Sequence, residues 1–309
     1  MPLSLVYRPK NLDEFFGNDS IKDSLKSVLS REDKPKTILF SGPSGCGKTT
    51  LARIVADMLG CDGMDLVEHN ISNMRGIDTA REIISSCQFE PLYGSVRVVI
   101  LNECHKATNE FQNAMLEILE EPPKGVYFIL CTTEPEKLLK TIKTRSTTYT
   151  VTPLRKHDMI NLVNWVLESE GVPLSDKVKD AILFAAEGCA RKAMVILDQI
   201  IDLQEEEKQL EAINENTPDE TTVIDLCRKI MAKEPGPNRW KELSTMLKGI
   251  DQEPEGVRRA ILGYLSSTLL NGNHKDGERI VRLMTEFMNN YYDTGKSGLV
   301  TSCYMSTLV

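Results

Sequence analysis

The sequence lacks several features that define specialised classes of protein. None of its eight cysteines belongs to a C-x-x-C pair, which argues against a zinc knuckle and favours small core thiols in a reducing compartment. No apolar run approaches the roughly 18 residues of a membrane-spanning helix, and the first residues contain no signal-peptide hydrophobic region. The histidines share no metal-ligand spacing (His69, His105, His157 and His274). We therefore expect a cytoplasmic protein that makes no contact with membranes.

Positive charge is also scarce. The 37 Lys and Arg residues are outnumbered by 45 Asp and Glu residues, and the net charge is −8. This balance argues against a protein coated with basic residues for binding nucleic acid, but it is compatible with a local basic track. The 41% of hydrophobic and 27% of charged residues are typical of a globular protein, and 309 residues suffice for two or three domains.

One glycine-rich segment says most about function. It fills every position of the G-x-x-x-x-G-K-T motif: Gly42, Pro43, Ser44, Gly45, Cys46, Gly47, Lys48 and Thr49. An apolar run precedes the motif and a helix-like segment, beginning with Thr50, follows it, as in a phosphate-binding loop. The backbone N–H groups of such a loop surround phosphate, the lysine reaches the β- and γ-phosphates, and the threonine hydroxyl ligates Mg²⁺. The motif predicts that the protein binds ATP or another nucleoside triphosphate with Mg²⁺.

Apolar runs alternate with helical segments in the first half of the chain. We expect strands at 38–40, 66–69, 96–101, 126–131 and 147–151, and helices near 20–30, 48–59, 76–87 and 108–120. Such alternation predicts a parallel sheet that is covered on both faces. After Pro153 only helical periodicity remains, with helices around 160–167, up to 188, and at 191–203, 223–232, 238–249, 255–270 and 276–292.

These patterns predict an α/β plus all-α fold. A P-loop parallel-sheet domain is expected at 1–152, a small helical lid at 153–204 and a C-terminal helical collar at 205–309. The polar segment 205–222 is interpreted as the boundary that opens the collar.

An acidic residue follows the buried run 98–101. Glu103 occupies the position from which a carboxylate orients or deprotonates the attacking water in ATP hydrolysis. Asn102 stands where an Asp that supports the metal's water shell is expected. A neutral amide oxygen can hold a metal-bound water less firmly than a carboxylate, so the rate of hydrolysis stays open.

Several segments, in order over residues 5–200, resemble AAA+ sliding-clamp-loader ATPase subunits. The segment YRPKNLDEFFGN (7–18) resembles the part of these proteins that folds over adenine. The segments ECHKAT (103–108), LEEPP (119–123) and FILCTTEPEKL (128–138) are similar to the bacterial DNA polymerase III gamma/tau subunit, whereas RGID (75–78) resembles replication factor C small subunits. TRS (144–146) replaces the Ser-Arg-Cys motif of the family, and GCARKA (188–193) resembles its sensor-2 helix start. The gamma/tau zinc module is absent, and the closest description is a compact subunit of cellular or phage origin.

The resemblance implies a role for each matching residue. The residues that would surround the nucleotide, besides the phosphate loop, are Tyr7, Arg8, Phe16, Gly17 and Thr50. Thr133 would contact the γ-phosphate or the attacking water, and Arg191 would reach the phosphates from the lid. Arg145 would be an arginine finger that acts on the ATP of a neighbouring subunit. A solvated surface position is the alternative interpretation of either arginine.

The resemblance also implies partners. These are other loader subunits in a homo- or hetero-pentamer, a sliding clamp, and primer–template DNA whose phosphates are followed by helix N-termini and single basic residues. Arg75 and Lys106 are the candidates for this contact. ATP binding would open the clamp, and DNA would trigger the hydrolysis that releases it.

Two other functions remain open. In the first, the chain is an ATP-binding structural subunit of a loader in which Asn102 impairs hydrolysis. In the second, it is another AAA+ DNA motor, such as a branch-migration helicase. Such helicases usually end in a winged-helix domain, and the helical pattern of 223–292 contains no β-hairpin signal.

Overall fold

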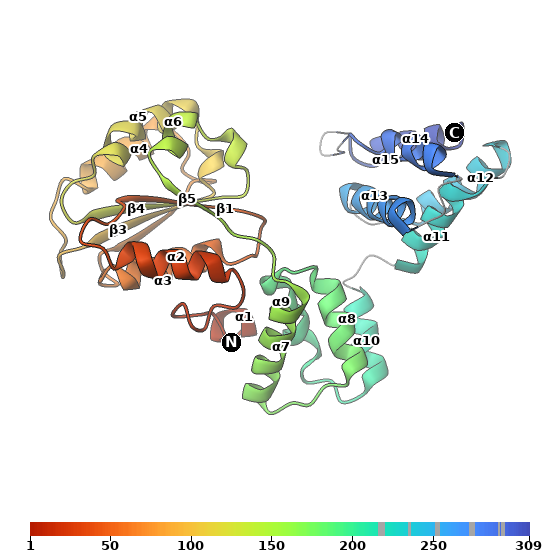
Figure 1. The fold of residues 1–309 in the computed structure, drawn as a ribbon, viewed down its shortest axis with the longest axis horizontal. Coiled ribbons are helices and arrows are strands. Elements are labelled where there is room, and N and C mark those ends of the chain that lie inside the picture. Colours follow the sequence, from red (N-terminus) through yellow and green to blue (C-terminus); the bar gives the residue numbers. More distant parts are fainter. Residues whose placement is uncertain (216–219, 234–235, 251–253, 272–275, 290, 292–293) are drawn as a thin grey trace. The chain divides into compact units, whose positions relative to one another are not determined.

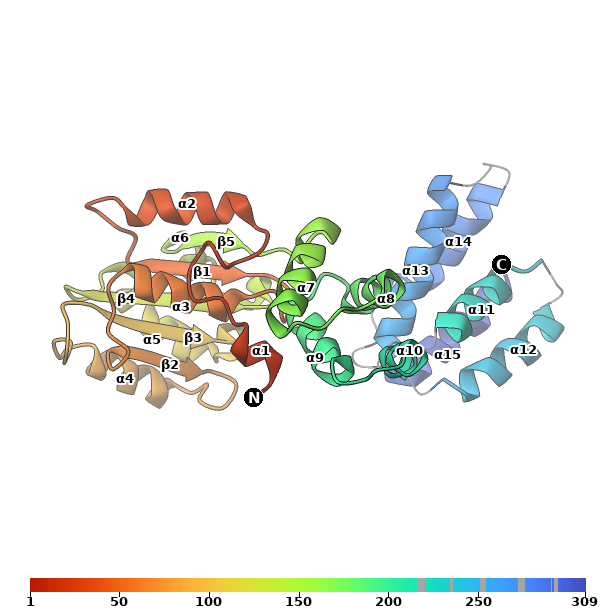
Figure 2. The ribbon, with the colours of Figure 1, turned by 90° about the horizontal axis from the view of Figure 1, so that it is seen from below.

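The computed structural model describes residues 1–215, 220–233, 236–250, 254–271, 276–289, 291 and 294–309. His274 lies outside these residues. The chain forms two compact units, Met1–Leu210 and Glu211–Val309 (Figures 1 and 2). The further division of the first unit into a sheet domain and a lid stays a prediction.

A five-stranded sheet organises the first unit, and every strand pairing in it is parallel. The order is β2-β3-β4-β1-β5, with β1 at Thr37–Ser41, β2 at Leu66–Asn70, β3 at Arg97–Asn102, β4 at Val126–Thr132 and β5 at Thr147–Thr150. Each strand end lies within one residue of its predicted position. The predicted parallel sheet is therefore confirmed.

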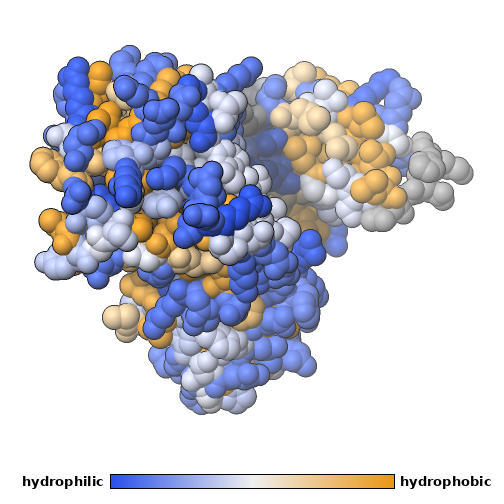
Figure 3. All heavy atoms as spheres, turned by 60° about the vertical axis from the view of Figure 1, so that its left-hand side comes forward, coloured by the Kyte–Doolittle hydropathy of each residue, from blue (hydrophilic) through white to orange (hydrophobic). Residues whose placement is uncertain are grey.

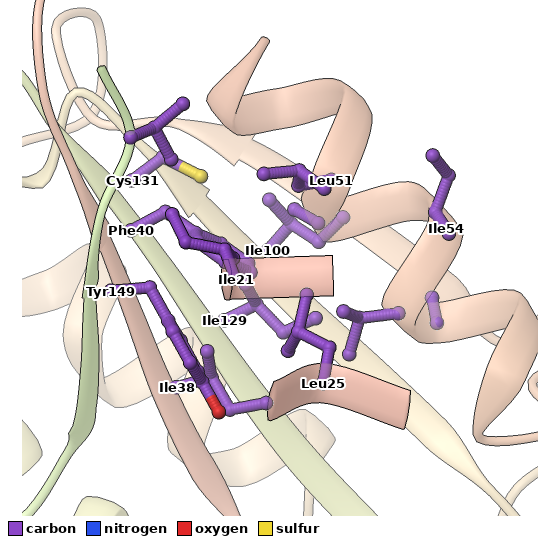
Figure 4. Close-up of a cluster of buried hydrophobic side chains, with 14 of the residues drawn as sticks. Ile21, Leu25, Ile38, Phe40, Leu51, Ile54, Ile100, Ile129, Cys131 and Tyr149 are labelled. Carbon is purple, nitrogen blue, oxygen red and sulfur yellow. The ribbon is translucent and has the colours of Figure 1, made fainter. Parts of the chain in front are cut away.

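Helices cover both faces of this sheet (Figure 1). One face carries α2 (Asp19–Leu29) and α3 (Lys48–Met58), and the other carries α4 (Ile77–Ser86), α5 (Asn109–Glu120) and α6 (Lys140–Thr144). Side chains of a strand alternate between the two faces. Ile38 and Phe40 of β1 therefore pack with α2 and α3 (Figure 4), whereas Leu39 joins the core on the α4 and α5 side. This double burial explains the continuous apolar runs of the strands.

Three helices follow the sheet in the same unit. They are α7 (Lys156–Glu170), α8 (Asp176–Ala186) and α9 (Ala190–Ile200). The short α1 (Leu3–Val6) packs on α9, where the Leu3 N–H donates to Asp198 Oδ1 at 3.0 Å. The first residues of the chain are thus held by the helices that follow the sheet.

The polar segment 205–222, interpreted as a boundary, contains the division between the two units, which falls after Leu210. It also contains a helix that was not predicted, α10 (Glu206–Glu215). Over its described residues 206–213, the buried residues are Gln209 and Ile213, and Gln209 donates from Nε2 to the Leu203 carbonyl oxygen at 2.6 Å. A helix with so few apolar anchors has too weak a periodic pattern to be recognised in the sequence.

In the described part of the second unit, helices are the only regular secondary structure. It contains α11 (Glu220–Met231), α12 (Gly236–Lys248), α13 (Pro254–Asn271), α14 (Gly277–Glu286) and α15 (Gly295–Ser306). The prediction of a single helix at 276–292 is wrong, since α14 ends at Glu286. Beyond that end, the backbone N–H of the buried Tyr291 donates to Glu255 Oε2 at 2.9 Å, which replaces a helical hydrogen bond by one to a carboxylate.

Two expectations about the whole chain can be compared with the structure. All eight cysteines are free thiols and six of them are buried, as expected for core residues. Within the described residues, no helix has both the length and the apolar character needed to cross a bilayer.

Candidate nucleotide-binding site

The glycine-rich loop joins the carboxyl end of β1 to the start of α3. Gly45 has φ +74° and Gly47 has φ +96°, a backbone conformation that side chains rarely permit. A Cβ on Gly45 would lie 2.3 Å from Cys189 Sγ, and one on Gly47 would lie 2.7 Å from the Phe15 ring. The loop conformation and its close neighbours therefore both require glycine at these two positions.

A cavity of about 320 Å³ opens beside this loop. The predicted nucleotide-binding and catalytic residues that line it are Tyr7, Arg8, Phe16, Ser44, Gly45, Cys46, Gly47, Lys48, Thr49, Thr50, Glu103 and Arg191. Eight other predicted site residues do not line it: Gly17, Gly42, Pro43, Asn102, Thr133, Arg145 and the two DNA-binding candidates Arg75 and Lys106. Segments from the amino terminus, the sheet and α9 thus meet at one place.

Positive side chains are concentrated in this cavity. The Lys48 ammonium is almost fully buried and donates to the carbonyl oxygens of Gly42 and Pro43, at 2.8 Å each. Burial lowers the pKa of Lys48, against the opposing charge of Glu103. Burial also lowers the pKa of Arg8, and the charge of Arg191 contributes to the lowering of both. An anion placed among these three cations would relieve their mutual repulsion.

The metal-binding candidates lie at the same edge of the sheet. Thr49 Oγ1 donates to Asn102 Oδ1 at 2.7 Å, which brings the end of β3 against the start of α3. The described residues contain no group of three or more His, Cys, Asp or Glu side chains that could hold a metal by themselves. Hard oxygen donors that leave most positions to phosphate and water suit Mg²⁺. The donor set therefore fits a Mg²⁺ ion that arrives with a nucleotide.

Aromatic residues form one wall of the site. The Tyr7 and Trp165 rings meet edge to face with centroids 5.2 Å apart, and the Phe16 ring lies 5.8 Å from the same indole. The Tyr7 hydroxyl donates to Glu170 Oε1 at 2.6 Å, so α7 fixes this residue from two positions. Sequence reasoning missed Trp165, because its pairing with residues 7 and 16 depends on a contact across about 150 residues.

The start of α9 lies directly on the phosphate loop. The backbone N–H of Arg191 donates to the Gly45 carbonyl oxygen at 3.4 Å, and the Cys189 thiol donates to the Ser44 carbonyl oxygen at 3.7 Å. A Cβ on Gly188 (φ +78°) would lie 2.8 Å from the Leu154 carbonyl oxygen. Movement of α9 would therefore be transmitted to the loop through these direct contacts.

Thr133 and Gly17, two other predicted site residues, lie next to elements that border the cavity. Thr133 follows β4 directly, and the preceding residue, Thr132, accepts a hydrogen bond from the Gly42 N–H through its carbonyl oxygen at 3.2 Å. Thr133 is thus next to the start of the phosphate loop. Gly17 has φ +66°, and a Cβ there would lie 2.8 Å from Leu154 Cδ2, so it permits close packing against the segment before α7. Nucleotide contacts of either residue stay predictions.

Comparisons with known proteins agree with this geometry. The family described as "DNA polymerase III, delta subunit" matches residues 64–155. The DNA polymerase III subunit gamma/tau of Mycobacterium tuberculosis (strain ATCC 25618 / H37Rv) is 34% identical over 224 residues, which are 65% of this chain and 39% of that protein. The replication factor C small subunit of Natronomonas pharaonis is 32% identical over 191 residues, 61% of this chain and 58% of its own length. The chain is thus similar to a DNA polymerase III gamma/tau subunit and to a replication factor C small subunit.

Solved structures identify the fold. The Thermotoga maritima RuvB Holliday junction branch migration motor superposes with a TM-score of 0.59 over 77% of this chain and 85% of its own. Its sequence identity is 17%, so this likeness shows the fold alone. The chain spans well under half the length of the gamma/tau relative, and the activities of that whole protein are not transferred by the match.

Arg145 lies at the amino ends of the strands, whereas the phosphate loop lies at their carboxyl ends. It caps α6 two residues before β5, and β5 begins beside Ile38 at the amino end of β1. Arg145 donates from Nε and Nη2 to Glu120 Oε2 at 2.7 and 2.6 Å, and from Nη1 to the Thr141 carbonyl oxygen at 3.2 Å. The five residues of β1 separate the two ends by roughly 16 Å. The arginine is therefore out of reach of the cavity in its own chain.

The two candidate DNA-binding residues lie near each other. Arg75 precedes α4 and Lys106 precedes α5, and both side chains are exposed. The Arg75 carbonyl oxygen accepts from the backbone N–H of Thr108, the residue that caps α5. Two helix N-termini and two basic residues thus share one part of the surface, an arrangement that suits phosphate.

Proposed function

We propose that this chain is an ATP-driven motor subunit of a sliding-clamp loader, which opens the clamp and loads it on primer–template DNA. The observation that carries the proposal is the convergence of Lys48, Arg8, Arg191 and Glu103 on one cavity beside a phosphate loop. Three cations and a row of backbone N–H groups suit a triphosphate, and the carboxylate suits a water molecule that attacks it. The similarity to a DNA polymerase III gamma/tau subunit and to a replication factor C small subunit supports a role of this ATP chemistry in DNA replication.

The roles of the residues follow from their places. Glu103 orients or deprotonates the attacking water, while Lys48 and Arg191 stabilise the negative charge of the phosphates. Thr49 would hold a Mg²⁺ ion directly and Asn102 would hold it through water, and the bound ion would neutralise more of that charge. Asn102 weakens this hold without removing it, since its oxygen faces the Thr49 hydroxyl.

Arg145 makes the proposed motor an oligomer. An arginine that is roughly 16 Å from its own phosphate loop can act as a finger only on the nucleotide of a neighbouring subunit. Head-to-tail contacts of this kind close into rings or continue as spirals. We propose a pentamer, built from this chain alone or with partner subunits. The collar expected at 205–309, most of which is the unit Glu211–Val309, would hold it together.

Partner surfaces can also be proposed on the first unit. Arg75 and Lys106 would contact DNA phosphates without reading bases. Apolar residues reach the surface among polar ones (Figure 3), and three of them, Phe89, Leu92 and Tyr93, are each more than 65% exposed in the loop after α4. The buried Asp65 carboxylate accepts from the N–H groups of Leu92 and Tyr93 at 2.7 and 2.8 Å. A loop that is held this firmly yet exposes apolar side chains is our candidate for the contact with the clamp.

Two alternatives predict different behaviour. A structural subunit with hydrolysis impaired by Asn102 would bind ATP without turnover. A branch-migration helicase would respond to branched DNA alone, and the absence of strands among the described residues after 211 speaks against its winged-helix domain.

The deciding experiment is ATP turnover by the purified chain, with its co-encoded partner, in the presence and absence of primer–template DNA and sliding clamp. Stimulation by both together would support the loader motor. Tight ATP binding without turnover would support the structural subunit, and stimulation by branched DNA regardless of clamp would support the helicase.

A further inference from the structure

His105 lies two residues after Glu103 in a short 3₁₀-helix, Cys104–Lys106, and its side chain is 2% exposed. It does not line the nucleotide cavity. Its ring faces three side chains: Nδ1 is 3.2 Å from Thr132 Oγ1, and Nε2 is 3.1 Å from Glu134 Oε1 and 3.6 Å from Glu103 Oε2. A buried imidazole thus connects the residue after β3 with the end of β4.

The hydrogen-bond network determines which ring nitrogen carries the proton. The Thr132 hydroxyl oxygen accepts from the Glu134 N–H at 3.0 Å, and its own proton can be donated to Nδ1 when the ring proton is on Nε2. Nε2 must then carry the ring proton, because it faces two carboxylates and a bare nitrogen would repel both. Burial lowers the pKa of His105, although both carboxylates oppose this, and a neutral ring agrees with the network.

One N–H therefore faces two carboxylates. Glu134 is at hydrogen-bonding distance from it, and Glu103, whose side chain is 40% exposed, is 0.5 Å farther away. Glu134 is in turn held by Lys137 Nζ at 2.7 Å. A small movement of the segment after β4 is sufficient to change which carboxylate accepts the hydrogen bond from the Nε2–H group, because the two distances differ so little.

We propose that His105 is a positioning residue for hydrolysis. Its Nε2–H group donates a hydrogen bond that holds Glu103 for activation of water, and Glu134 competes with Glu103 as the acceptor of this hydrogen bond. This inference rests on the proposed ATPase function and adds a means of regulation to it. A change at the end of β4, next to the phosphate loop, reaches Glu103 through the imidazole. Turnover then depends on contacts that the nucleotide itself does not make.

Substitutions of His105 test the role of the Nε2 proton. A glutamine amide nitrogen reaches the place of Nε2, whereas an asparagine amide nitrogen reaches only that of Nδ1. We expect His105→Asn to lower kcat roughly tenfold or more with KM for ATP changed less than about threefold, because a positioned base contributes at least this much. His105→Gln should retain most of the wild-type kcat. His157→Ala, on the exposed face of α7, is the control.

Substitution of Glu134 tests the competition. Glu134→Gln keeps an acceptor but removes its charge, which weakens the hydrogen bond that it accepts from His105. We therefore expect kcat in the absence of DNA to rise roughly fivefold, because the Nε2–H group then donates to Glu103 instead. Glu136→Gln, an exposed carboxylate on the same segment, should leave turnover unchanged. Melting temperatures of all variants identify any that fold poorly.

The outcomes separate this inference from the function on which it rests. Absence of turnover in the wild-type chain with DNA and clamp would refute both. Wild-type turnover with equal losses in the Gln and Asn variants, or with KM raised as much as kcat falls, would refute the role of His105 alone. A decrease of kcat in Glu134→Gln would refute the competition.

Discussion

Arg145 allows a direct test of the assembly of the proposed motor. In its own chain the guanidinium pairs with Glu120, and the two side chains are 27% and 55% exposed. A pair with this much exposure contributes at most about 1 kcal/mol to folding, so Arg145→Ala should fold. It should also bind ATP normally, because the arginine does not line the nucleotide cavity. Only turnover in the assembled protein should fall, by roughly a thousandfold, the contribution of an arginine finger at its low end.

A mixing experiment turns this expectation into a number. Lys48→Ala cannot hold the triphosphate but still presents Arg145 to its neighbour, whereas Arg145→Ala has the opposite defect. In a ring of this chain alone, formed from equal amounts of the two variants, about a quarter of the interfaces join an intact site to an intact finger. Turnover should therefore recover to about a quarter of the wild-type value if the sites act independently. If this chain assembles with a partner subunit, the same statistics apply to the interfaces between its own copies.

The assay is steady-state ATP turnover with primer–template DNA and clamp, measured for each variant, for the mixture and for Arg31→Ala, an exposed arginine, as control. ATP binding is measured separately by a fluorescent analogue. An Arg145→Ala protein with wild-type turnover would refute the finger. A mixture no more active than its components, although both variants assemble, would refute action in trans.

Three further predictions follow from the structure. Asn102→Asp should lower the Mg²⁺ concentration for half-maximal turnover roughly tenfold, because a carboxylate replaces the amide beside Thr49; an unchanged Mg²⁺ titration would contradict the metal role. The double variant Arg75→Ala, Lys106→Ala should weaken DNA binding for all sequences and lower the salt slope by about two, whereas basal turnover stays unchanged. Hydrogen bonds from Arg258 lower the pKa of Glu255 from 4.5 to about 2, so its stabilisation of the helical unit is present above pH 4.5 and lost as the pH falls toward 2. Acid unfolding of Glu255→Gln should then be less steep than that of the wild-type chain.

Much of the fold could be predicted because its signals are local. The three inner strands, β1, β3 and β4, are short apolar runs buried on both faces, and the phosphate loop between β1 and α3 is a contiguous motif. The helices α1, α6, α10 and α15 were not predicted, and the end of α14 was misplaced. Beyond the end of α14 the structure depends on a distant contact, that between Glu255 and the Tyr291 N–H. Periodicity carries no information about such contacts.

The candidate site divides in the same way. Lys48, Thr49 and Glu103 were predicted because each directly follows or opens a recognisable element. The contacts of Trp165 with two site residues and of His105 with Glu103 were not predicted, since a tryptophan in a helix and a buried histidine are usually core residues. Only the packing of α7 on the amino-terminal segment and of β4 beside β3 gives them their neighbours.

The sequence by itself determined the chemistry of the phosphate loop, the alternation of strands and helices, and the residue types available for hydrolysis, because these depend on neighbours along the chain. The tertiary structure decided which of them meet. All strands of the parallel sheet run in the same direction. The loop, Asn102 and Glu103 therefore meet at the carboxyl ends of the strands, and Arg145 lies at the amino ends. The tertiary structure also determined that one buried imidazole lies between Glu103 and Glu134, an arrangement that requires two adjacent strands to end side by side.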